Sequence, residues 1–194
     1  MSRATEGSLP VWHDAAMKTI CVYCGAASGN KPEFMRGARD FGRLLAKRGI
    51  ALVYGGGHVG LMGVVAEAVL EGGGHVTGVI PRSMADKELA HTGVQKLHVV
   101  ESMHDRKALM AELSDAFVVL PGGIGTLDEF FEIWTWRQIG LHDKPIGILD
   151  VSGFWQPLIA LAGHLDRHEF LHRQALKMIV HHPEPARLLT LLGA

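Results

Sequence analysis

The sequence lacks an excess of either charge. Its 194 residues hold 19 Lys and Arg against 20 Asp and Glu, for a net charge of −1. This balance excludes the basic footprint that binds duplex nucleic acid and the polybasic patch that binds a membrane surface. The longest stretch without these charged residues, 49–66, contains six glycines and a histidine. It therefore does not indicate a membrane span.

Cysteine is equally scarce. The chain has two, Cys21 and Cys24, in a CxxC pattern that can indicate redox chemistry or a zinc site. Both fall in an expected buried strand, where residues three apart point to opposite faces, about 10 Å from each other. That separation is too large for a disulfide, and the sequence offers no second cysteine pair for zinc. We therefore interpret both cysteines as structural.

The N-terminus has no apolar segment of the kind that a signal peptide requires. We expect residues 1–17 to form a loose leader and residues 18–194 to form one domain of a cytoplasmic protein. The length fits a single domain. A hydrophobic content of 47% with 20% charged residues is typical of a globular chain and excludes disorder for most of it.

Short apolar segments alternate with helical ones along the chain. Strands are predicted at 19–24, 50–54, 75–80, 97–100, 116–120, 146–150 and 178–180. Helices are predicted at 32–48, 60–71, 103–113 and 126–140, with further helix toward the C-terminus. This alternation indicates an α/β fold with a doubly wound, mainly parallel sheet and helices on both faces. In such folds the ligand binds at the carboxyl ends of the strands.

Glycine is the residue that the chain has in abundance, with 24 copies. Three glycine-bearing turns, residues 25–29, 55–57 and 122–126, follow predicted strands and should open at one edge of the sheet. Glycine lets the backbone approach a ligand, and the next helix offers free N–H groups to an anion. None of the turns is a GxGxxG or Walker A motif. They predict a phosphate site, with plain turn geometry as the alternative; the candidate loop residues are Ser28, Gly56, Gly57 and Met103.

Two charged segments accompany these turns. Residues 126–129 have the spacing of a capping box, with Thr126 at the N-cap and Glu129 three residues later. The alternative is that Glu129 faces the cleft beside the phosphate. Arg106 and Lys107 begin a helix at the end where its dipole disfavours cations. They therefore indicate an anionic ligand that compensates for this position, with an ordinary solvated helix face or a bridge to Asp105 as the alternative.

Other candidate sites are weaker. Three histidines share an i, i+4, i+8 spacing that could hold a metal: His164, His168 and His172. Without a nearby carboxylate to complete the ligand set, we predict no metal site. Three tryptophans could stack on a base, although packing in a core or interface is their more common role: Trp134, Trp136 and Trp155.

Taken together, the quoted segments resemble the LOG ("lonely guy") family of cytokinin riboside 5′-monophosphate phosphoribohydrolases. Residues 121–129 fit its PGGxGTxxE motif and residues 102–107 fit its MHxRK motif. The similarity runs from about Lys18 to the C-terminus, with supporting matches at 54–57, 60–63, 90–93 and 140–145. The first turn departs from a common family form, which has serine early in the turn.

The resemblance implies a Rossmann-like fold and an enzyme that hydrolyses the N-glycosidic bond of N6-modified adenosine 5′-monophosphates. The products would be the free base and ribose 5-phosphate. Arg106 and Glu129 would be the catalytic pair, with Lys107 and residues 123–126 holding the phosphate and ribose. The implied substrate-binding residues are Glu88, Arg106, Lys107, Gly122, Gly123, Ile124, Gly125, Thr126, Leu127, Asp128, Glu129 and Thr135.

The resemblance further implies a homodimer, with helices near both motifs packed across the two-fold axis, and no cofactor or metal. Its partner would be a nucleoside 5′-monophosphate, with no role for nucleic acid or membrane. Related proteins often carry the label "lysine decarboxylase", but the sequence shows no cofactor-binding lysine motif. Two alternatives stay open: an AMP nucleosidase without N6 preference, and a non-catalytic nucleotide-binding module.

The implied reaction passes through a ribosyl oxocarbenium ion. A carboxylate must stabilise the positive charge and orient water, and Glu129 suits that role. A cation near the departing base or the phosphate is also needed. Arg106 is always protonated, so it suits an electrostatic clamp and not a proton donor.

Overall fold

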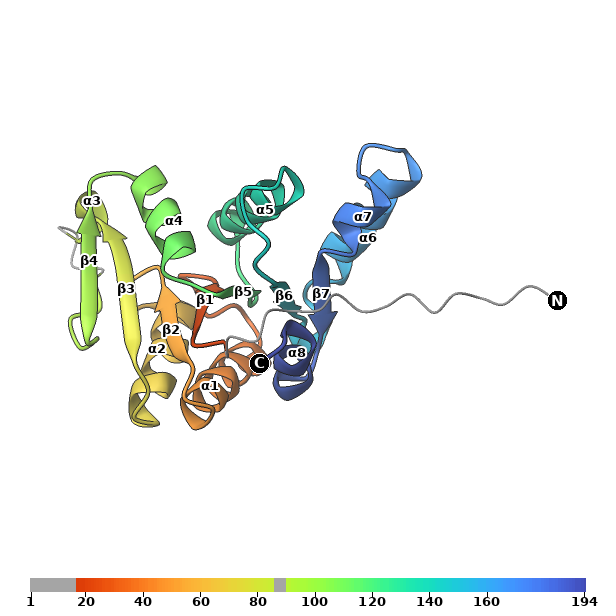
Figure 1. The fold of residues 1–194 in the computed structure, drawn as a ribbon. Helices are drawn as coiled ribbons and strands as arrows, with labels where there is room; N and C mark the ends of the chain where they lie inside the picture. The colour runs from red at the N-terminus through yellow and green to blue at the C-terminus, as the bar shows by residue number, and fades with distance from the viewer. Residues whose placement is uncertain (1–16, 86–89) are drawn as a thin grey trace.

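The computed structural model describes residues 17–85 and 90–194 and contains one parallel sheet of seven strands (Figure 1). The strand order is β4-β3-β2-β1-β5-β6-β7, and every neighbouring pair is parallel. The strands are β1 (Thr19–Tyr23), β2 (Ala51–Tyr54), β3 (Val76–Pro81), β4 (Lys96–Val100), β5 (Ala116–Val119), β6 (Ile146–Leu149) and β7 (Ile179–His182). The predicted doubly wound α/β fold is confirmed.

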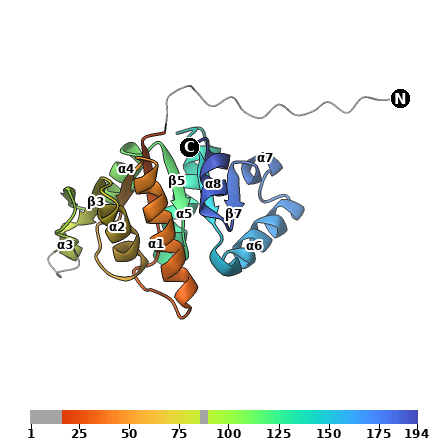
Figure 2. The same ribbon diagram turned by 90° about the horizontal axis from the view of Figure 1, so that it is seen from below.

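Helices cover both faces of this sheet. They are α1 (Pro32–Lys47), α2 (Gly60–Glu71), α3 (Arg82–Ala85), α4 (Met103–Glu112), α5 (Ile124–Gln138), α6 (Gln156–Arg167), α7 (Arg173–Leu176) and α8 (Pro185–Leu192). A short 3₁₀ helix spans Val151–Gly153. Helices α1, α2 and α8 pack together on one face, as the view from below shows (Figure 2), while α4, α5 and α6 lie on the other.

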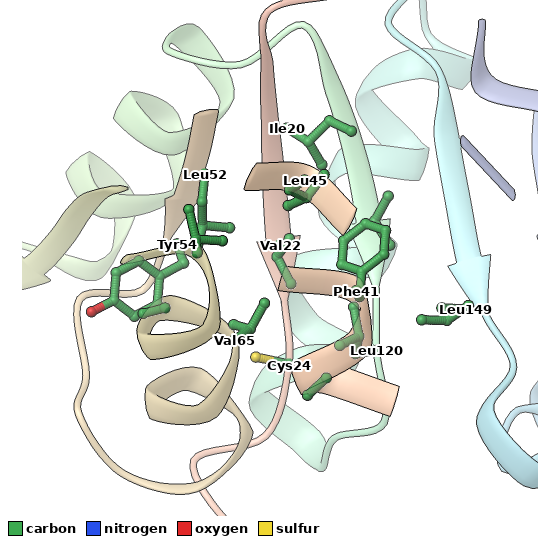
Figure 3. Packing of buried hydrophobic residues seen from close by; sticks show 14 of the residues in the cluster. Ile20, Val22, Cys24, Phe41, Leu45, Leu52, Tyr54, Val65, Leu120 and Leu149 are labelled. Carbon is green, nitrogen blue, oxygen red and sulfur yellow. The ribbon is translucent and has the colours of Figure 1, made fainter. Parts of the chain in front are cut away.

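Two hydrophobic clusters form, one on each face of the sheet. Alternate side chains of β1 divide between them: Ile20 and Val22 pack with Phe41 and Leu45 of α1 (Figure 3), and Tyr23 stacks on Phe117 at 6.0 Å on the other side. The central strands are buried on both faces, which is why they read as continuous apolar runs. The fold is thereby built around β1 and β5.

The two cysteines occupy opposite faces, as the strand geometry predicts. Cys24 belongs to the cluster under α1 and α2, and Cys21 to the cluster under α4 and α5. Both are free and buried, and burial raises the pKa of both thiols well above the usual value. Buried, protonated thiols of this kind are inert.

The predicted elements agree with the structure to within a few residues. Helix α2 has the predicted bounds, whereas α5 begins two residues earlier than predicted, and β7 begins one residue later and ends two residues later. The expected leader lies outside the described residues except for Met17, which packs against the core. Across residues 17–85 and 90–194, no helix is long and apolar enough to cross a membrane.

Candidate active site

The site lies where the winding of the sheet reverses, between β1 and β5. Here the two strands run side by side, and the turns that follow them touch: the Gly25 N–H donates to Pro121 O at 3.0 Å. The carbonyl of Gly25 in turn accepts the Leu61 N–H at 3.0 Å, which ties the start of α2 to the same turn. Ligands of doubly wound sheets bind at this kind of crevice.

Glycine is required at this junction for steric reasons. A Cβ at Gly122 would collide with Thr126, and a Cβ at Gly60, which has φ +61°, would collide with Ala26. The chain can therefore turn tightly enough to join three loops only where it has no side chain. Two of the predicted glycine turns thus converge, as expected from the edge that they share.

A cavity of about 550 Å³ opens at this crevice. One wall is polar and comes from α4 and the start of α5, and the other walls are backbone turns and apolar side chains. Its lining residues from the predicted site are Ser28, Met103, Arg106, Gly122, Gly123, Gly125, Thr126, Asp128 and Glu129. Its apolar lining includes Phe34, Leu61, Met62, Met84 and Phe154.

Arg106 and Glu129 meet in this polar wall. Arg106 Nη2 lies 3.2 Å from Glu129 Oε1, and each side chain is only 8% exposed. The guanidinium is fixed from behind, because its Nε donates to Val79 O at 3.2 Å. Gly55 leaves the space that it fills, since a Cβ there would collide with the guanidinium. The predicted catalytic pair is therefore brought into contact inside the cavity.

The carboxyl group of Glu129 titrates near neutrality. Burial raises its pKa to about 7, although Arg106 acts in the opposite direction, and the carboxylate of Asp128 raises it further. Burial therefore outweighs the neighbouring cation. Perturbed carboxyl groups in a cavity are a common feature of active sites.

Lys107 contacts two carboxylates of α5. Its Nζ lies 3.0 Å from Asp128 Oδ2 and 3.0 Å from Glu132 Oε2, and its side chain is 10% exposed. Desolvation acts to lower its pKa, but hydrogen bonds to the two carboxylates raise the pKa above the usual value. Lys107 is not among the residues that line the cavity.

The predicted capping box at Thr126 is wrong. Helix α5 begins at Ile124 with Gly123 as its N-cap, and no side chain caps it. Glu129 is therefore the sixth residue of α5, in its second turn, and its carboxylate contacts Arg106. The first N–H groups of α5 have no side-chain cap, and Gly123, Gly125 and Thr126 at this end of the helix line the cavity.

A capping box exists instead at the start of α4. The Asp105 N–H donates to Ser102 Oγ at 3.1 Å, and the Ser102 N–H donates to Asp105 Oδ2 at 3.1 Å. Asp105 also places a negative charge in the first turn of α4. It thereby offsets the unfavourable position of the two cations that follow it.

Several predicted residues lie outside the cavity lining. Glu88 lies outside the described residues. Ile124 is 87% exposed, which leaves its side chain in solvent. The others that do not line the cavity are Gly56, Gly57, Lys107, Leu127 and Thr135.

The weaker candidates take structural places. Trp134 and Trp155 are buried in the core and Trp136 packs against it. His164 and His168 have ring centroids 4.4 Å apart, but α6 ends at Arg167 and His172 precedes α7. Over the described ranges, no group of three or more His, Cys, Asp or Glu residues could hold a metal ion.

The parallel sheet, its helical layers and the glycine turns at its crevice define a Rossmann-like α/β protein. One solved structure of this shape is the molybdenum cofactor carrier protein of Chlamydomonas reinhardtii, with a TM-score of 0.69 and 19% identity over 90% of this chain and 96% of that chain. That likeness establishes the fold alone.

The chain belongs to the LOG family, whose sequence family is described as "Possible lysine decarboxylase" and matches residues 62–192. One curated relative is the cytokinin riboside 5′-monophosphate phosphoribohydrolase LOG of Oryza sativa subsp. japonica, 45% identical over 89% of this chain and 71% of that protein. Another is LOG1 of Arabidopsis thaliana, with the same activity in its name, 43% identical over 91% of this chain and 83% of that protein. The resemblance to the LOG family, predicted from the two motifs, is confirmed.

Proposed function

We propose that this protein hydrolyses the N-glycosidic bond of N6-modified adenosine 5′-monophosphates, such as cytokinin riboside 5′-monophosphates. The C1′–N9 bond breaks, the oxygen of water joins C1′, and the released base carries away a proton. The products are the free base and ribose 5-phosphate. The names of relatives that share about 45% of the sequence support this activity.

The contact between Arg106 and Glu129 carries the proposal. As C1′ separates from the base, positive charge develops on the ribose, and a buried carboxylate stabilises it far better than water does. Glu129, with a pKa raised by burial to about 7, is also able to accept a proton from the attacking water near neutral pH. Arg106 stays protonated and stabilises negative charge on the leaving side.

The phosphate fits the start of α5. The cavity reaches Gly123, Gly125 and Thr126, where backbone N–H groups and the positive end of the helix dipole meet it. Binding the phosphate there fixes the ribose, so that remote binding energy positions the reacting carbon. The apolar walls from Phe34, Met62 and Phe154 suit a base with an apolar N6 substituent.

Decarboxylation of lysine, which the family description names, fits this site less well. That chemistry conventionally uses a neutral lysine amine that forms a Schiff base with a pyridoxal cofactor. Lys107 is the lysine beside the catalytic pair, but two carboxylates hold its ammonium and raise its pKa. The ammonium form does not act as a nucleophile.

A product assay by chromatography tests the proposal. The protein is incubated with isopentenyladenosine monophosphate, AMP and adenosine. Free base from the first, with none from adenosine, is the expected result. Equal release from AMP would indicate an AMP nucleosidase without N6 preference. Binding of all nucleotides without release of base would indicate a non-catalytic module and overturn the proposal.

We further propose a cytoplasmic homodimer that associates through the outer face of α4 and α5. Large apolar side chains of α5 and of the turn after it are exposed: Ile124, Phe131, Ile139 and Leu141. Exposed apolar side chains that gather on one surface are typical of association sites. Light scattering should give twice the mass of the chain, and Ile139→Asp should lower that mass; a monomeric wild type would contradict the dimer.

A further inference from the structure

Lys107 bridges the two helices that carry the catalytic pair. It extends from α4, and its Nζ lies 3.0 Å from both Asp128 Oδ2 and Glu132 Oε2 on α5. Asp128 and Glu132 are four residues apart and share one face of α5. A single ammonium therefore holds two consecutive turns of α5 against α4.

This bridge runs beside the catalytic contact. Arg106 and Lys107 are neighbours on α4, and Glu129 and Asp128 are neighbours on α5. The Arg106–Glu129 contact of 3.2 Å and the Lys107–Asp128 contact of 3.0 Å thus cross the same helix pair. We therefore expect a change in the Lys107–Asp128 contact to alter the spacing of Arg106 and Glu129.

The bridge also determines the charge around Glu129. Three carboxylates, those of Asp128, Glu129 and Glu132, lie within about one turn of α5, and Asp128 and Glu132 both raise the pKa of Glu129. Arg106 and Lys107 on α4 lower that pKa. From β1 and the residue after it, the groups that interact with Glu129 are Cys21, Tyr23 and Cys24, whose own pKa values are raised, so they stay neutral.

We propose that Lys107 is a positioning residue that holds Glu129 opposite Arg106 through Asp128 and Glu132, and that it does not bind the substrate phosphate. We place the phosphate at the start of α5, where Gly123, Gly125 and Thr126 line the cavity and Lys107 does not. This inference rests on the proposed hydrolase function. In this inference the lysine of the MHxRK motif contacts other side chains of the protein and does not contact the substrate.

Lys107→Met tests the assignment, with Lys107→Arg as the conservative rescue. Lys144→Met is the matched control, because Lys144 also ties a loop to α4, through a 2.7 Å hydrogen bond to Ala111 O, but lies away from the cavity. Three quantities are measured for each: binding of ribose 5-phosphate by calorimetry, the pH profile of kcat/KM, and the pKa of Glu129 by ¹³C NMR of labelled glutamate, assigned with Glu129→Gln.

A positioning role predicts that Lys107→Met binds ribose 5-phosphate within about twofold of the wild type. The acidic limb of its kcat/KM profile and the pKa of Glu129 should both move up by about one pH unit, because a nearby cation is lost. Lys107→Arg should restore most of this shift, and Glu132→Gln added to Lys107→Met should reverse part of it. Lys144→Met should leave all three quantities unchanged.

A phosphate-binding role predicts the opposite pattern and would overturn the inference. Ribose 5-phosphate would then bind at least about tenfold more weakly to Lys107→Met, whether or not the pKa of Glu129 moved. The NMR titration gives the pKa of Glu129 even if the wild type releases no base. A failure of the proposed function is therefore seen in the wild-type assay, and a failure of this inference in the variant.

Discussion

The guanidinium of Arg106 lies 3.2 Å from the carboxylate of Glu129, and both side chains are nine-tenths buried. A buried ion pair gains little net stability, because the cost of removing both charges from water offsets their attraction. The pKa of Glu129, raised to about 7 by burial, reflects that cost. The contact fits the catalytic role that we propose for Glu129, because a catalytic carboxyl group is most useful when it titrates near the working pH.

Replacement of Glu129 by glutamine should abolish most turnover and leave binding intact. Glu129→Gln keeps the shape of the side chain but removes the charge that stabilises the ribosyl cation. We expect kcat to fall at least about 100-fold while the Kd for nucleotide changes little. Glu112→Gln, an exposed change on α4, is the control. Turnover near the wild-type value in Glu129→Gln would remove Glu129 from the chemistry.

The rate should depend on pH through Glu129. Its ionised form is the active one, so kcat/KM should rise as the pH passes through about 7 and level off above it. Arg106 stays protonated throughout and contributes no limb. A profile of kcat/KM between pH 5 and 9 measures this directly. A limb near 4.5, the ordinary value for glutamate, would mean that Glu129 is solvated in the working enzyme.

Gly55 should control the position of Arg106. A Cβ at this residue would collide with the guanidinium and approach Met62 Sδ. Gly55→Ala should therefore displace Arg106 from Glu129 and lower kcat by about tenfold or more, with a smaller effect on folding stability. Gly163→Ala in α6, where the added Cβ has space, is the matched control. Unchanged kcat in Gly55→Ala would show that the guanidinium adjusts without loss.

The fold was predictable to the extent that burial is regular. Central strands such as β1 and β5 are apolar throughout because both faces are covered, and Gly72 marks the end of α2. Helix starts were less predictable, because capping depends on the local backbone. Thr126 and Glu129 have the spacing of a capping box, yet Gly123 caps α5 and the real box is at Ser102.

The site was predictable only in part, because charge and glycine patterns do not tell which way a side chain points. The motifs pointed to Arg106 and Glu129, which line the cavity. The sequence does not tell that Lys107, the next residue, contacts two carboxylates of α5 and does not line the cavity. The apolar lining was missed, since Phe34 and Met62 have the spacing of ordinary core residues. Gly55 was grouped with a phosphate turn, whereas its role is to make room for Arg106.

The turn between β6 and α6 provides a last test, because it presents Phe154 to the cavity. Asp150 is buried and accepts the Trp155 N–H at 2.7 Å and the Gln156 Nε2–H at 2.5 Å. Ser152 between them has φ 54°, a left-handed conformation that costs a residue with a side chain about 1 kcal/mol. The side chain of Asp150 thus holds the turn against the backbone strain at Ser152.

Substitutions at these two residues should change stability in opposite directions. Asp150→Ala leaves a buried N–H without its acceptor and should lower the free energy of unfolding by about 1–3 kcal/mol. Ser152→Gly relieves the left-handed strain and should raise it by about 0.5–1 kcal/mol. Urea denaturation measures both. Asp150→Ala should also raise KM, because Phe154, whose ring meets that of Phe34 edge-on at 5.3 Å, loses its support. A decrease in stability for Ser152→Gly would mean that the serine side chain compensates for its strained backbone.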